Sequence, residues 1–143
     1  WGMWNILGEE LTGDKSDEDI RPWFYTWALM TRYFKGEMDI VKTSGKLPDM
    51  VRFVVGKSTD GDITFSVINN SEDDIELTID IKSFNANGKG FNKYLYSEST
   101  RPVDSMGFPI PEKKNLMLEE SFELKLLPKS VVLYTTYNAR GKS

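Results

Sequence analysis

The sequence "ITFSVINNSEDDIELTIDIKSF" (residues 63–84) contains two short segments in which apolar and polar residues alternate. In the first segment Ile63, Phe65 and Val67 fall on one side of an extended chain, and the same spacing begins again at Ile75. The polar run "NSEDD" between the two segments is rich in turn-forming residues. A period of two with polar residues between is the pattern of antiparallel strands that bury one face. The stretch therefore predicts two strands of an antiparallel sheet.

The sequence on both sides of this stretch is organised in the same way. Upstream, "VRFVVG" precedes "KSTDGD", in which Asp60-Gly61 is a strong signal for a hairpin turn. Downstream, "NANGKG" turns the chain into "FNKYLYSES", and a proline-bearing loop over residues 101–111 precedes "NLMLE", "SFELKLL" and "SVVLYTTY". Seven or eight short strands with turn signals about every ten residues predict an antiparallel β-sandwich, and a mainly β protein.

The segment before the strands, "DEDIRPWFYTWALMTRYFKG" (residues 17–36), has a helical period instead. Ser16, followed by three acids, is typical of a helix N-terminus. Arg32 and Lys35 suit the last turn, and Gly36 is expected to stop the helix in a left-handed conformation. The sandwich is therefore expected to follow one aromatic-rich α-helix.

Most of the circumference of this helix is apolar. Tyr25, Leu29 and Tyr33 lie on other sides than its main apolar face. A helix of this kind is buried between two layers, and one small sandwich can cover only one side of it. We therefore expect a second unit to cover the other side, with these residues packing between the two: Trp23, Phe24, Trp27, Met30 and Phe34.

Composition excludes several classes of function. The chain has 143 residues, enough for one domain with a core, and its net charge of −4 gives no basic surface for nucleic acid. The apolar runs are far shorter than the ~20 residues of a membrane span. The absence of cysteine and histidine excludes disulfides, thiolate nucleophiles, Ser–His–Asp triads and ordinary zinc sites in this chain. We expect no metal, no cofactor, no nucleic-acid partner and no membrane span.

The acidic residues form no recognisable site. Asp60 and Asp62 with Asp73 and Asp74 match no calcium-loop spacing, and are interpreted as solvated hairpin tips. The acids of the strands are expected to point outward, so no carboxylate pair is placed to act across a glycosidic bond, and no catalytic residue is expected. Asn69 begins a formal glycosylation sequon, which has a meaning only in a eukaryotic protein.

Exposed aromatic residues are candidates for stacking on sugars. Trp1 and Trp4 are the main candidates, because they precede a loop in the manner of a strand end, and their alternative role is core packing. The sandwich has further candidates, for which packing in the core or against a hairpin is the favoured interpretation: Phe91, Tyr94, Tyr96 and Phe108. The apolar first residues, "WGMWNILG", also suggest that Trp1 is a cut edge within a longer protein.

The order of these segments resembles the C-terminal end of a glycoside hydrolase in which a (β/α)8 catalytic barrel is followed by a small β-sandwich. The resemblance rests on the pattern W-x-L-x-x-R-Y-F from Trp27 to Phe34, on the segment from Gly36 to Ile40, and on the closing residues. Those closing residues are Leu127, Pro128, Ser130 and Val131. The motifs indicate a broad architecture and no single substrate.

The resemblance implies two domains, with residues 1–40 forming the end of the catalytic barrel and residues 41–143 forming the sandwich. The partner would be the barrel of the same polypeptide, with polysaccharide as a further partner, and the catalytic carboxylates would lie upstream of Trp1. We expect a bacterial protein that is secreted or periplasmic, although the lack of cysteine fits a cytosolic one equally well. Two alternatives stay open: a carbohydrate-binding module, and a surface interaction or adhesion sandwich.

Overall fold

The computed structural model describes residues 23–82 and 88–139. In that part the chain forms one helix and eight strands. This confirms the predicted mainly β sandwich, preceded in the sequence by an aromatic-rich helix. In chain order the elements are α2 (Trp23–Tyr33), β1 (Met38–Ile40), β2 (Val51–Ser58), β3 (Ile63–Asn69), β4 (Ile75–Asp80), β5 (Phe91–Tyr96), β6 (Lys113–Leu116), β7 (Ser121–Leu126) and β8 (Ser130–Thr135).

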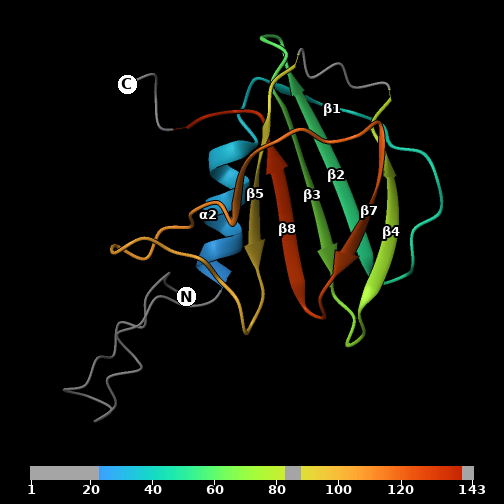
Figure 1. Ribbon diagram of the computed structural model, residues 1–143, viewed down its shortest axis with the longest axis vertical. Helices are drawn as coiled ribbons and strands as arrows, with labels where there is room; N and C mark the ends of the chain where they lie inside the picture. Colours follow the sequence, from blue (N-terminus) through green and yellow to red (C-terminus); the bar gives the residue numbers. More distant parts are fainter. Residues whose placement is uncertain (1–22, 83–87, 140–143) are drawn as a thin grey trace.

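The strands form two antiparallel sheets of unequal size (Figure 1). The larger sheet has six strands in the order β1-β2-β3-β8-β5-β6, and the smaller sheet pairs β4 with β7. The hairpin between β2 and β3 turns at Asp60-Gly61 as predicted, with Gly61 at a φ of 79° and its N–H donating to the Ser58 carbonyl. A positive φ is the reason that glycine suits this turn.

The main core lies between the two sheets. Phe65, at the middle of β3, is fully buried and stacks on Tyr134 of β8 with ring centroids 4.9 Å apart. From the smaller sheet, Ile79 and Leu124 close over this cluster. The inward residues of β4 alternate with exposed ones, which is the pattern that the sequence predicted for this strand.

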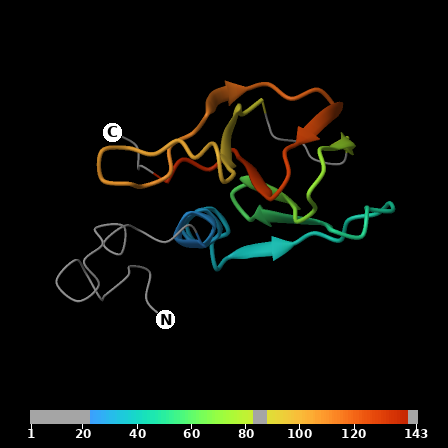
Figure 2. The ribbon, with the colours of Figure 1, turned by 90° about the horizontal axis from the view of Figure 1, so that it is seen from below.

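Helix α2 covers the opposite face of the six-stranded sheet. Val132 belongs to the core between the sheets, whereas its neighbour Leu133 packs on the helix, because successive side chains of a strand point to opposite faces. Figure 2 shows the consequence, with the helix on one side of the large sheet and the small sheet on the other. The molecule therefore has three layers, and the helix forms one outer layer.

Two local expectations were wrong. The helix ends at Tyr33, and Gly36 is not in a left-handed conformation; the chain leaves through a turn in which the Met38 N–H donates to the Lys35 carbonyl and leads into β1. The strand expected at "NLMLE" lies two residues earlier, at Lys113–Leu116. Asn115 has a φ of 53° and the register with β5 shifts, so the pairing cannot continue smoothly.

Some expectations fall on residues outside the described part of the chain. These include Trp1, Trp4 and the helix start at Ser16, and they stay predictions. Within residues 23–82 and 88–139, no helix is long and apolar enough to cross a membrane.

Candidate functional site

Helix α2 is fixed to the sheet by its Leu29 and Tyr33 side. Leu29 is 1% exposed and packs with Tyr33 against Tyr94 and Leu133 of the sheet. The Tyr33 and Tyr94 hydroxyls are hydrogen-bonded to each other, and the Tyr33 carbonyl accepts a hydrogen bond of 2.9 Å from Thr64. The sheet thus packs on the side of the helix that the sequence placed off the main apolar face, and Met30 and Phe34 of the main face also pack against this cluster.

The end of the helix approaches the sheet closely at Gly56. A Cβ at this position would lie 3.1 Å from Met38 Sδ and 3.1 Å from a ring carbon of Phe34. Glycine therefore lets the helix end and β1 lie against β2 without displacement of either. The local sequence gave no sign of this role, because the residues involved come from three separate segments.

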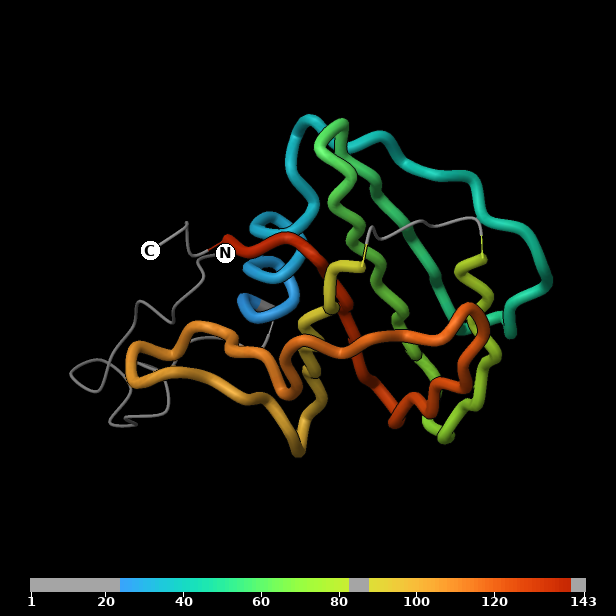
Figure 3. Tube along the Cα trace, turned by 45° about the horizontal axis from the view of Figure 1, so that its top comes forward, coloured from blue at the N-terminus to red at the C-terminus, as the bar shows by residue number. Residues whose placement is uncertain are grey.

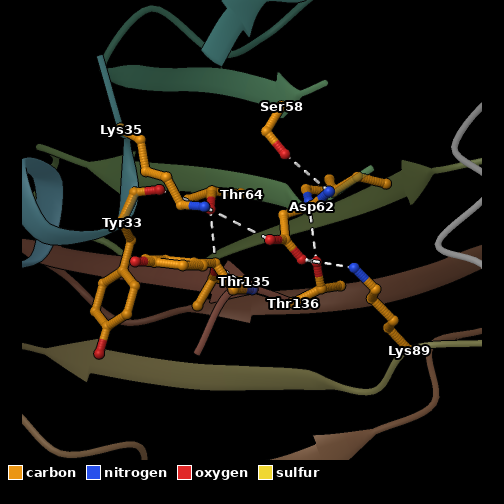
Figure 4. A network of polar contacts seen from close by, with 10 residues as sticks. Tyr33, Lys35, Ser58, Asp62, Thr64, Lys89, Thr135 and Thr136 are labelled. Carbon is orange, nitrogen blue, oxygen red and sulfur yellow. Dashed lines mark hydrogen bonds and ion pairs between the residues drawn. The ribbon is translucent and has the colours of Figure 1, made fainter. Parts of the chain in front are cut away.

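A buried carboxylate links the helix end to three other segments (Figure 4). Asp62 accepts hydrogen bonds from Lys89 Nζ at 2.9 Å and from the Thr136 hydroxyl at 3.2 Å. Lys35 Nζ, just beyond the helix, lies 3.7 Å from the second carboxylate oxygen. The Asp62 N–H donates to the Ser58 hydroxyl at 3.0 Å. The interpretation of Asp62 as a solvated hairpin tip was wrong, since the residue is only 9% exposed.

The surroundings of Asp62 favour its charged form. Burial alone would raise its pKa, but the hydrogen bond and charge of Lys89 outweigh this, with help from Thr136 and Lys35, and hold the pKa below the usual 3.8. Because the folded-state pKa is the lower one, the stabilisation is present above about pH 4 and is lost as the pH falls through the folded-state value.

We expect Asp62→Asn to lower the free energy of unfolding by about 2 kcal/mol at neutral pH, the scale of hydrogen bonds to a charged group. The difference from the unmodified protein should shrink as the pH falls below 3.8, where the carboxylate becomes protonated. Urea denaturation of both proteins at pH 7, 5 and 3 measures this difference in the free energy of unfolding. Asp60→Asn, an exposed change in the same hairpin, is the control and should have little effect at any of these pH values. A pH-independent difference for Asp62→Asn would contradict this account.

The outer side of helix α2 carries exposed apolar surface. Trp27 is 45% exposed and Phe24 is 5% exposed, whereas Met30 and Phe34 are partly buried against the Leu29 and Tyr33 cluster. The side chain of Trp23 lies outside the described part of the chain. A shallow groove of ≈ 180 Å³ runs along this side, and its lining includes Phe24, Trp27, Ala28, Phe108 and Pro109. This surface, lined mainly by apolar side chains, is the candidate functional site.

The aromatic residues of the sandwich are mostly structural. Phe91 and Tyr94 are buried, in agreement with the favoured interpretation of core packing. Tyr96 stacks on Tyr25 of the helix, with ring centroids 5.8 Å apart. Phe108 is 39% exposed and touches the helix, and it is the one of these four that belongs to the candidate site.

A second, larger cleft of ≈ 550 Å³ lies between residues 41–47 and β4. Its lining includes apolar residues such as Phe53 and Leu77 and charged residues of both signs. Glu76 and Asp80, which border it, are exposed on alternate positions of β4, as the sequence predicted for the acids of the strands.

Asn69, which begins the formal glycosylation sequon, is buried. Its side-chain amide donates hydrogen bonds of 2.8 and 2.9 Å to the carbonyls of Asp73 and Leu127, so this amide is already bonded within the fold.

Comparison with known proteins gives a likeness of fold. No protein-family model and no curated protein matches the sequence. Among solved structures, a family 30 glycoside hydrolase xylanase from Clostridium acetobutylicum aligns with a TM-score of 0.66 and 9% identity, over 94% of this chain and 30% of that one. A family 30 endoxylanase from Clostridium papyrosolvens C71 aligns with a TM-score of 0.61 and 12% identity, over 85% and 29%.

A third solved structure gives the same result. The catalytic domain of family 30 xylanase C from Talaromyces cellulolyticus aligns with a TM-score of 0.61 and 18% identity, over 85% of this chain and 25% of that one. The chain thus spans 25% to 30% of the length of these three structures. At such identities the likeness concerns the fold, which this chain shares with part of several glycoside hydrolases.

Proposed function

We propose that this chain is a non-catalytic, C-terminal part of a larger carbohydrate-degrading glycoside hydrolase. Residues 41–143 form its sandwich, residues 1–40 form the end of a catalytic barrel, and helix α2 packs between the two. The observation that carries the proposal is the exposed apolar side of α2, with Trp27 at its centre, on the helix face turned away from the sheet. The likeness to segments of family 30 structures supports it.

The energetics of the helix favour a covered outer face. An amphipathic helix buries one apolar stripe and exposes a polar one, but α2 has large apolar side chains on both sides. Burying a large apolar side chain contributes about 1.5–3 kcal/mol, so covering Trp27 and the groove beside it would join the two units firmly. The anchoring of α2 through Leu29, Tyr33 and the Asp62 contacts would make the helix a rigid joint.

In this proposal the chemistry belongs to the barrel. The sandwich stabilises the barrel, and the polysaccharide reaches the catalytic residues without contacting the described strands. The parent polypeptide would be bacterial and secreted or periplasmic. Strand β1, at residues 38–40, is hydrogen-bonded to β2 of the six-stranded sheet, so the last three residues of the segment assigned to the barrel already pair with the sandwich.

A comparison of activities tests the proposal. The longer polypeptide that contains this sequence is expected to hydrolyse at least one polysaccharide in a panel of xylans and β-glucans. The purified 143-residue chain is expected to release no reducing sugar above the blank from any of them, because the proposal places the pair of carboxylates that glycoside hydrolysis needs upstream of Trp1. Turnover by the purified chain, or a longer polypeptide that cleaves no glycosidic bond, would contradict the proposal.

A further inference from the structure

Residues 101–111, here called the arm, form a hydrogen-bonded turn beside the helix. Val103 and Pro109 form an antiparallel bridge, and the N–H of Asp104 donates to the Phe108 carbonyl at 2.9 Å. The tip is a tight turn in which the N–H of Gly107 donates to the Asp104 carbonyl, and Gly107 has a φ of 82°. The arm is therefore stabilised by its own hydrogen bonds and belongs to neither sheet.

The side chain of Asp104 organises the tip of the arm. It accepts hydrogen bonds from the N–H groups of Met106 at 2.9 Å and Phe108 at 3.0 Å. This arrangement fixes the backbone of two residues whose side chains are exposed, Met106 at 71% and Phe108 at 39%. A preorganised loop that presents apolar side chains loses little conformational entropy when a partner covers it.

The arm and helix α2 together enclose the apolar groove described above. Phe108 contacts Phe24 with ring centroids 6.0 Å apart, and the Arg101 guanidinium at the base of the arm lies 5.7 Å from the centre of the Tyr25 ring. In Figures 1 and 3 the arm extends past α2, away from the sheets. The arm thus continues the exposed surface of the helix rather than forming a separate one.

We propose that the arm is a second anchor for the catalytic barrel, and that the groove between arm and helix receives one large apolar side chain from it. The inference rests on the proposed function and assigns a specific part of that interface. The groove volume of ≈ 180 Å³ is comparable with the cavity of about 150 Å³ that takes benzene in an engineered protein. An aromatic ring or a branched aliphatic side chain therefore fits it.

The residues that line the groove suit a buried contact between two units. The walls of the groove are apolar side chains of Phe24, Trp27 and Phe108, while Thr31 and Arg32 lie at its lining as polar groups. A mainly apolar lining with a few polar groups is a common composition of an interface hot spot. The same barrel surface would contact Trp27 and the arm together, because both border one groove.

The test compares each substitution in the longer polypeptide and in the 143-residue chain. Phe108→Ala and Met106→Ser are expected to lower the Tm of the longer polypeptide by about 2–4 °C more than that of the chain. Met117→Ser is the matched control, because Met117 is also exposed, at 68%, and lies outside the arm. It is expected to have the same small effect in both proteins.

Trp27→Ala serves as a reference that separates the two proposals. A context-dependent loss of Tm for Trp27→Ala but not for Phe108→Ala and Met106→Ser would overturn the role of the arm and leave the helix interface intact. The absence of context dependence for all three substitutions would overturn the proposed function as well. Met106→Ser alters a side chain that is 71% exposed, so it keeps the test independent of any folding defect of Phe108→Ala.

Discussion

Phe65→Ala is expected to lower the free energy of unfolding by about 3–5 kcal/mol, the cost of removing a large aromatic side chain from a packed core. Phe65 is fully buried in the middle of β3. Its ring contacts aromatic rings of four other strands or loops, so no single neighbour can move to fill the space. These rings are Phe53, Phe91, Phe122 and Tyr134.

Urea denaturation of the 143-residue chain, followed by circular dichroism, measures this loss. The control is Phe108→Ala, which removes the same side chain from a position that is 39% exposed and should cost far less in this chain. Equal losses for the two substitutions would contradict the assignment of the core to the space between the sheets.

Trp27→Ala is expected to have the second large effect, and only in the longer polypeptide. There we expect a loss of about 3–5 kcal/mol in the free energy of unfolding, because the docked barrel would bury the indole ring. In the 143-residue chain Trp27 is 45% exposed, and the loss should stay below about 1 kcal/mol. Denaturant titrations of both proteins with and without the substitution measure the difference, and equal losses in the two contexts would count against a covered helix face.

The strands could be predicted because their signals are local. The alternation of Ile63, Phe65 and Val67 gave β3 with its observed bounds, and Asp60-Gly61 gave the turn before it. The helical spacing around Trp27 likewise gave an α-helix there. These patterns depend on residues that are close in sequence, and the physical preferences of short segments decide them.

The contacts that hold the helix on the sheet could be predicted only in part, because they join segments that are distant in the sequence. Asp62 meets Lys89, 27 residues away, and Thr136, 74 residues away, so nothing near Asp62 in the sequence distinguishes it from its exposed neighbour Asp60. The need for a glycine at position 56 also arises from packing, since Phe34 comes from the helix end. Which side of the helix faces the sheet likewise depends on tertiary packing, which the local sequence pattern does not determine.

The sequence predicted a helix buried between two layers, but not which residues face the sheet. The pattern singled out the face that carries Trp27, which is 45% exposed, whereas Met30 and Phe34 of the same face pack against the cluster on the sheet. The contacts to the sheet come from Leu29 and Tyr33, whose spacing of four residues makes them neighbours on another side. One face therefore packs on the sheet, and in the proposed function Trp27 on the other face would contact the barrel.

Hydroxyl-radical footprinting of Trp27 tests the central claim most directly, since it reports the solvent exposure of individual side chains in both forms of the protein. Met117 serves as the internal reference for a side chain outside the proposed interface. The account predicts strong labelling of Trp27 in the 143-residue chain and clear protection in the longer polypeptide, with Met117 labelled equally in both. Equal labelling of Trp27 in the two forms would contradict the account, because the outer face of the helix would then be open to solvent in the whole protein.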